Sequence, residues 1–236
     1  ASDVYKRQGL DSSYGLTGMA EGEFAVQDLT WEIVNKMNLG VELGFLNGMI
    51  DLQLDYFDER RKDIFMPRES VPMTAGFMKQ PWKNFGKVTN QGVEVTLNVN
   101  KQFGKDLFVS LMGTFTYAHN EITEKDEPSA VVGTNRAETG HPVGQLTGYI
   151  AEGLFTADDF EDVSTGKLKE GIPTQSFVGK LRPGDIRYRD VNGDGKVDVF
   201  DKSPIGGTKD PEIVYGFGLN MKYKDLDFGA LFQGIG

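Results

Sequence analysis

The fold class can be inferred from one segment, Met37-Asn38-Leu39-Gly40-Val41-Glu42-Leu43-Gly44-Phe45. Every second residue in it is apolar, and the residues between are polar or glycine. Because successive side chains of a β-strand point to opposite faces, this alternation predicts a strand with one apolar and one polar face. Leu46-Asn47-Gly48 follows and predicts a hairpin turn, since Asn and Gly accept positive φ.

The same alternation recurs along the chain and groups into three hairpins with short turns, at about 37–56, 93–117 and 213–232. Long connections separate the hairpins, and the longest covers about 121–211. Compact soluble domains seldom carry such connections, whereas outer-membrane barrels combine short turns on one rim with long extracellular loops on the other. The pattern therefore predicts an all-β chain from a large antiparallel transmembrane β-barrel. A soluble β-sandwich or solenoid with one solvated face is the alternative.

The polar faces of these runs carry acidic side chains. A strand of about 9–11 residues crosses a bilayer when tilted, and the runs have this length or slightly more. Charged residues in such strands suit a wet lumen better than a dry sandwich core. We therefore expect four carboxylates to face the lumen: Glu42, Asp51, Asp55 and Glu94.

Composition excludes several classes of protein. The chain has 236 residues, 35 acidic against 25 basic side chains, a formal charge of −10 and no cysteine. A disulfide scaffold and a thiolate metal site are therefore impossible. A nucleic-acid partner is not expected, because phosphate contact needs a basic surface. No nucleophile, zinc-protease or phosphate-loop motif occurs, and no pair of carboxylates is fixed at a glycosidase separation, so we expect no enzyme and no catalytic residue.

The first eight residues read Ala1-Ser2-Asp3-Val4-Tyr5-Lys6-Arg7-Gln8. This octapeptide equals the translation of the end of a transposon-based sequencing adapter. We therefore predict that residues 1–8 are a non-native tail and that residues 9–236 are the native part, taken from inside a longer gene.

The longest connection holds one sharp motif, Asp190 to Asp201, of the form D-x-N-x-D-G-x-x-D-x-x-D. Ca²⁺ takes about six to eight oxygen ligands, and a glycine at the sixth position allows the sharp bend that gathers them. We expect a structural Ca²⁺ with direct ligands from Asp190, Asn192, Asp194 and Asp201, the backbone carbonyl of Lys196, and Asp198 through water.

Two features qualify this metal prediction. The last position is Asp rather than Glu, and its shorter arm favours weaker or monodentate binding. Prolines and glycines flank the motif, at Pro183-Gly184 and Ser203-Pro204, so the helix pair of an EF-hand cannot form. An Asx-rich surface turn without metal is the alternative.

Several segments resemble, in family order, the C-terminal barrel of SusC/RagA-type TonB-linked outer-membrane transporters. Each segment is loose alone, and together they are specific. The segments are Asp28-Leu29-Thr30-Trp31-Glu32, 38–45, 55–63, 90–94, 140–155 and 183–190 running into the Asp190–Asp201 motif and on to Ile205-Gly206.

This resemblance implies a barrel of about 22 strands in the outer membrane of a Gram-negative bacterium of the Bacteroidota. It also implies an internal plug, a SusD-like surface lipoprotein as a lid, and import of oligosaccharides or peptides with energy from TonB. Residues 9–236 would then be a fragment, a partial TonB-dependent receptor barrel with a long extracellular loop region at about 121–211. The plug and the part that contacts TonB would lie in a missing N-terminal part, and the substrate stays unnamed.

A secreted calcium-binding module of the dockerin or adhesin type is the alternative function. Dockerins carry two segments like Asp190–Asp201, and each continues into a helix. This chain has one copy, and Ser203-Pro204 follows it. The proline disfavours the helix and therefore the dockerin interpretation.

Overall fold

A computed structural model describes the chain except for residues 1, 9–14, 22–24, 27 and 76–78. The chain forms two compact units. Residues 1–129, 139–143 and 210–236 form the first, which we call the barrel unit. Residues 130–138 and 144–209 form the second, which we call the loop unit. Among the described residues, no helix is both long and apolar enough to cross a membrane.

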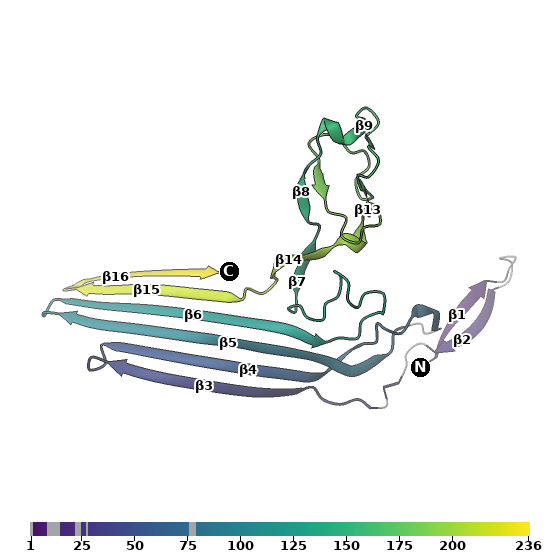
Figure 1. Cartoon of the computed structure of the whole chain (residues 1–236). Coiled ribbons are helices and arrows are strands. Elements are labelled where there is room, and N and C mark those ends of the chain that lie inside the picture. Colours follow the sequence, from purple (N-terminus) through teal and green to yellow (C-terminus); the bar gives the residue numbers. More distant parts are fainter. Residues whose placement is uncertain (1, 9–14, 22–24, 27, 76–78) are drawn as a thin grey trace. The chain divides into compact units, whose positions relative to one another are not determined.

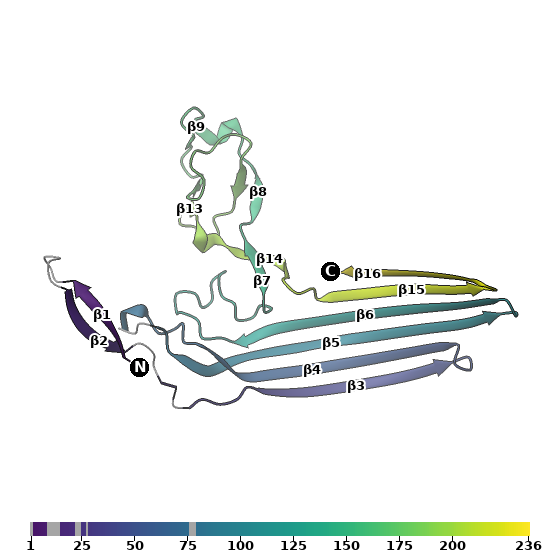
Figure 2. The same ribbon diagram turned by 180° about the vertical axis from the view of Figure 1, so that it is seen from behind.

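The barrel unit is built on a six-stranded antiparallel sheet with the order β16-β15-β6-β5-β4-β3 (Figures 1 and 2). Its strands are β3 (Ile33–Phe45), β4 (Ile50–Pro67), β5 (Trp82–Phe103), β6 (Leu107–Glu124), β15 (Ile213–Tyr223) and β16 (Leu226–Ile235). The predicted hairpins are confirmed as the pairs β3–β4, β5–β6 and β15–β16. The sheet is open, with β3 and β16 at its edges.

The strand register sorts the side chains of the sheet onto two faces. One row of paired residues is apolar throughout: Val41, Leu54, Val95, Phe115 and Tyr215. The next row, one residue along each strand, belongs to the other face: Gly40, Asp55, Glu94, Thr116 and Val214. The predicted alternation is therefore present in five neighbouring strands and in phase across them.

The apolar face has the height of a bilayer. On β5 it runs from Val93 to Phe103, with the charged Lys101 next to its end, and ten steps of about 3.3 Å at a tilt of about 40° span roughly 25 Å. Tyr56 and Tyr117 pair with Val93 at one limit, while Phe103 and Tyr223 both pair with Leu107 at the other. Aromatic girdles lie at such limits in outer-membrane barrels.

The turn between β3 and β4 needs an unusual backbone. Leu46, Asn47 and Gly48 have φ values of 55°, 58° and 80°. Left-handed conformations are easy for glycine and tolerated by asparagine, which explains the predicted Asn-Gly signal. Leu46 adopts the same region although its sequence gives no such signal.

The loop unit is made of short strands and two 3-10 helices, η2 (Ala157–Asp159) and η3 (Val199–Asp201). Its strands are β7 (Gln145–Gly148), β8 (Ala151–Leu154), β9 (Phe160–Asp162), β10 (Lys167–Leu168), β11 (Thr174–Gln175), β12 (Ile186–Tyr188), β13 (Lys196–Val197) and β14 (Ser203–Thr208). They form four two-stranded sheets: β7–β14, β8–β12, β9–β10 and the parallel pair β11–β13.

A small hydrophobic core holds the loop unit together. Phe155, Phe160 and Leu181 are buried, and three partly buried side chains pack against them: Leu168, Ile172 and Val178. The rings of Phe155 and Phe160 lie 5.8 Å apart between centroids. The longest connection is therefore a folded body rather than an extended loop.

Two further elements complete the barrel unit. The strands β1 (Ser2–Gln8) and β2 (Gly15–Glu21) pair with each other in an antiparallel hairpin. The 3-10 helix η1 covers Met73–Ala75. The adapter origin of residues 1–8 stays a prediction.

Candidate functional site

The four predicted lumen carboxylates lie on one face of the sheet. Asp55 pairs directly with Glu94 on β5, and Asp51 lies four residues before Asp55 on β4. Glu42 on β3 pairs with Gln53, which has the same parity as both aspartates. The register thus brings all four to the polar face.

The polar face is acidic, and its carboxylates are open to solvent rather than packed. Asp51, Glu42 and Glu94 are exposed, and Asp55 is half-buried. Gln53 Nε2 donates to Asp55 Oδ2 at 2.8 Å, which holds that carboxylate beside Glu94. Carboxylates placed opposite one another repel, and water lowers the cost of this repulsion. Their face therefore suits a water-filled channel.

The predicted metal loop is a network of turns closed by carboxylate oxygens. Asp190 accepts from the backbone N–H of Gly193 at 2.7 Å and of Gly195 at 2.8 Å. Asn192 Oδ1 accepts from Asp194 N at 3.0 Å, and Asp194 Oδ1 accepts from Lys196 N at 2.9 Å. The motif therefore forms successive Asx turns.

The last two predicted ligands belong to η3. Asp198 is its N-cap, and Asp198 Oδ1 accepts from Phe200 N at 2.8 Å. Asp201 is fully buried, and its carboxylate also accepts backbone N–H groups. Within the described part of the chain, no three Asp, Glu, His or Cys side chains converge to hold a metal ion. Cation binding by this loop stays a prediction.

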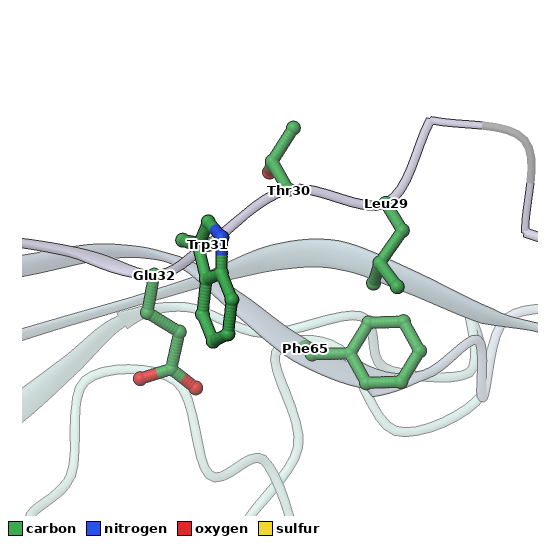
Figure 3. Close-up of a pocket in the computed structure, with 5 residues that line it drawn as sticks. All are labelled: Leu29, Thr30, Trp31, Glu32 and Phe65. Atoms are coloured by element: carbon green, nitrogen blue, oxygen red, sulfur yellow. The ribbon is translucent and has the colours of Figure 1, made fainter.

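The structure also places a pocket of about 590 Å³ at the start of β3 (Figure 3). It is lined by Leu29, Thr30, Trp31, Glu32 and Phe65. Trp31 is 92% exposed. In Figure 3 the Phe65 ring lies below Leu29 and beside the indole of Trp31, while Thr30 points away.

A side-chain amide fixes the backbone of this pocket. Thr30 N donates to Asn84 Oδ1 at 3.0 Å, and Asn84 Nδ2 donates back to Thr30 O at 3.0 Å. Asn84 Nδ2 also donates to Asp63 O at 2.7 Å, at a bulge of β4 where Asp63 has a φ of 58°. Asn84 thereby replaces a strand partner for Thr30. Sequence patterns give no sign of this arrangement.

Two polar tethers fasten the segments that leave the sheet. Asp126 accepts from Arg68 Nε at 2.8 Å, from Ser70 Oγ at 3.0 Å and from Ser70 N at 3.2 Å. Burial raises the pKa of Asp126, but the hydrogen bonds from Arg68 and Ser70 outweigh it and leave this pKa below its ordinary value. His119 Nδ1 lies 2.7 Å from Glu212 Oε1, which joins β6 to the residue before β15.

The comparisons with known proteins agree with this geometry. The family model described as "TonB dependent receptor-like, beta-barrel" matches residues 1–221. TonB-dependent receptor P3 of Formosa agariphila is 24% identical over 229 residues, which cover 92% of this chain and 22% of that protein. TonB-dependent receptor SusC of Bacteroides thetaiotaomicron is 28% identical over 218 residues, 86% of this chain and 19% of that protein.

Solved structures give the same fold. The RagAB peptide importer in its closed-closed state superposes with a TM-score of 0.64 at 20% identity, over 100% of this chain and 24% of that one. The chain spans about a quarter or less of the length of these relatives. TonB-dependent receptor barrels are outer-membrane proteins, and this localisation applies to the chain. The family model covers β3 to β6 and most of β15, and the chain belongs to the TonB-dependent receptor-like β-barrel family.

Proposed function

We propose that the chain is part of an outer-membrane TonB-dependent importer of oligosaccharides or peptides that works with a SusD-like lipoprotein. The six-stranded sheet with one apolar face of bilayer height and one acidic face carries this proposal. Such a sheet needs lipid on one side and water on the other, as the wall of a transport barrel does. TonB would act through parts of the receptor outside this chain.

The two faces would have separate roles in import. The apolar side chains would hold the wall in lipid, while Glu42, Asp51, Asp55 and Glu94 would keep the lumen hydrated beside the passing substrate. The loop unit would belong to the extracellular surface, where substrate and lid arrive. The likeness to SusC and to the RagAB peptide importer supports a SusD-like lipoprotein as the partner. It is compatible with either a glycan or a peptide as the substrate.

Growth tests this proposal directly. A strain that lacks the full-length receptor gene should lose growth on at least one oligosaccharide or peptide source that the parent uses, and the restored gene should recover it. A restored gene without its TonB-contacting part should not. The proposal would be refuted if the deletion strain, with loss of the protein from its outer membrane verified, grew as well as the parent on every glycan and peptide source.

We also propose that the Asp190–Asp201 loop binds a divalent cation such as Ca²⁺. The donor spacing supports it, and so does the bend at Gly195, which has a φ of 84°. Terbium luminescence of the full-length receptor should show one saturable site that Ca²⁺ competes for and Asp194→Asn weakens. No saturable signal, or an unchanged one in Asp194→Asn, would refute this second proposal.

A further inference from the structure

Asp201 is buried within the loop unit although its side chain is a carboxylate. Its side chain is fully buried, with 0% of its surface exposed. A buried carboxylate is costly unless hydrogen bonds satisfy its oxygens. Both oxygens of Asp201 have such partners, and all of the partners are backbone N–H groups of the loop that Asp201 ends.

The two oxygens reach opposite ends of that loop. Asp201 Oδ1 accepts from Val191 N at 2.8 Å and from Asn192 N at 3.3 Å, ten and nine residues back in the chain. Asp201 Oδ2 accepts from Asp198 N at 2.7 Å, and Asp201 N donates to Asp198 O at 3.1 Å. One carboxylate thus ties the first turn of the loop to the start of η3.

This arrangement competes with the role that spacing assigns to the residue. A ligand at the last position of a calcium loop turns one or both oxygens to the ion. Both lone pairs of Asp201 Oδ1 already accept N–H groups, so ligation through this oxygen would leave Val191 or Asn192 without its acceptor. Leaving such groups without a partner costs more than an ordinary hydrogen bond contributes.

We propose that Asp201 is a positioning residue that closes the loop with its own carboxylate, so that the loop is folded without a divalent cation. Closure and cation binding are then separate properties of one segment. Asp201 closes the loop, and any bound cation is held by the exposed oxygens of Asn192 and Asp194 with their neighbours. The inference therefore holds whether or not the chain serves an importer.

Hydrogen bonds from outside the loop to its backbone carbonyls also support closure without metal. Asn135 Nδ2 donates to Phe200 O at 2.9 Å and to Lys202 O at 2.7 Å, one residue to either side of Asp201. Ser176 N donates to Val197 O at 3.0 Å, in line with the β11–β13 pair. Protein groups therefore hold both flanks of Asp201.

Hydrogen–deuterium exchange of the full-length receptor in lipid nanodiscs tests the inference. The measured peptides contain the amides of Val191, Asn192 and Asp198, which donate to Asp201. Four samples are compared: the natural protein with Ca²⁺, the natural protein with EDTA, Asp201→Ala, and Asp194→Asn. Asp194→Asn is the matched control because it removes one charge from the same loop and keeps the Oδ1 acceptor.

We expect exchange in the natural protein to change less than about twofold on adding EDTA. We expect Asp201→Ala to speed exchange at these amides by about tenfold or more, with or without Ca²⁺, while Asp194→Asn leaves them slow in EDTA. A rise of about tenfold in the natural protein with EDTA would mean that a cation closes the loop and would overturn the inference. So would unchanged exchange in Asp201→Ala. The comparison of the natural protein with and without EDTA remains decisive if the variant does not fold.

Discussion

The side chain of Gln175 bonds the backbone of Tyr188 and so closes the open edge of β12. Gln175 Oε1 accepts from Tyr188 N at 3.0 Å, and Gln175 Nε2 donates to Ile186 O at 3.1 Å. These two groups point to the same edge of β12, and β8 pairs with the other edge. The buried amide of Gln175 thereby makes the hydrogen bonds that a third strand would make at this edge.

Replacing this amide tests its role. Gln175→Glu keeps an acceptor for Tyr188 N but sets an oxygen against Ile186 O, so we expect the loop unit to lose about 1–3 kcal/mol of local stability. Limited proteolysis of the full-length receptor, followed at sites within 144–209, measures it. Gln233→Glu on the exposed polar face of β16 is the control. Equal cleavage of both variants would contradict this role.

Gly92 leaves room for an aromatic ring on the neighbouring strand. It pairs with Phe57, and a Cβ at Gly92 would lie 2.5 Å from Phe57 Cζ. We expect Gly92→Ala to cost about 1–3 kcal/mol, because neither the ring nor the backbone beneath can move freely. Gly44→Ala on the same face would meet only Asp51 Oδ1 at 3.7 Å and should change stability by less than about 0.5 kcal/mol. Urea unfolding in lipid compares the two, and equal midpoints would refute the prediction.

The Asp126 tether should fail in acid. Because the folded pKa of Asp126 lies below its ordinary value of about 3.9, the tether stabilises fully above that value and is lost as pH falls through the lower, folded pKa. We expect proteolysis or exchange near Ser70 to be constant from about pH 5 to 8 and to rise below about pH 4. Asp126→Asn should show the raised rate already at neutral pH. Proteolysis or exchange near Ser70 that already rises between pH 7 and 5 in the natural protein would contradict this assignment.

The carboxylates of the polar face should set the charge preference of the lumen. Glu94→Gln with Asp55→Asn removes two facing charges, and we expect slower passage of cationic peptides and faster passage of anionic ones. Uptake of peptides of equal length and opposite charge measures the ratio. Asp58→Asn, which belongs to the other face, is the control. An unchanged ratio in the double variant would show that these carboxylates do not face the substrate path.

Local alternation made the sheet predictable. The period of two at 37–45 and its repeats identify each strand, and the Asn47-Gly48 signal identifies a turn. The pairing of β15 with β6 is different, because Ile213 follows its partner Tyr117 by 96 residues and no local pattern records their contact. The bulge of β4 and the Asn84 clamp likewise depend on contacts between distant segments.

The candidate site shows where spacing ceases to be informative. Glu42, Asp51, Asp55 and Glu94 share a face because parity alone decides it. The last position of the motif is compatible with two roles for Asp201, a metal ligand or an acceptor of backbone N–H groups. The sequence does not distinguish these roles, whereas the burial of the side chain in the structure does. The loop-unit core was not predictable either, since Phe155, Phe160 and Leu181 follow no regular period.

The barrel-wall assignment requires that one face of this sheet contacts lipid and the other contacts water. Spin labels placed singly at residues 50–57 of the full-length receptor in liposomes test this requirement. Labels in lipid are accessible to dissolved oxygen, and labels in water are accessible to a nickel chelate. This chain has no cysteine that would compete for the label. We predict oxygen accessibility at Leu52, Leu54 and Tyr56 and nickel accessibility at Asp51, Gln53 and Asp55. Absence of a two-residue period, or the opposite phase, would contradict the barrel-wall assignment.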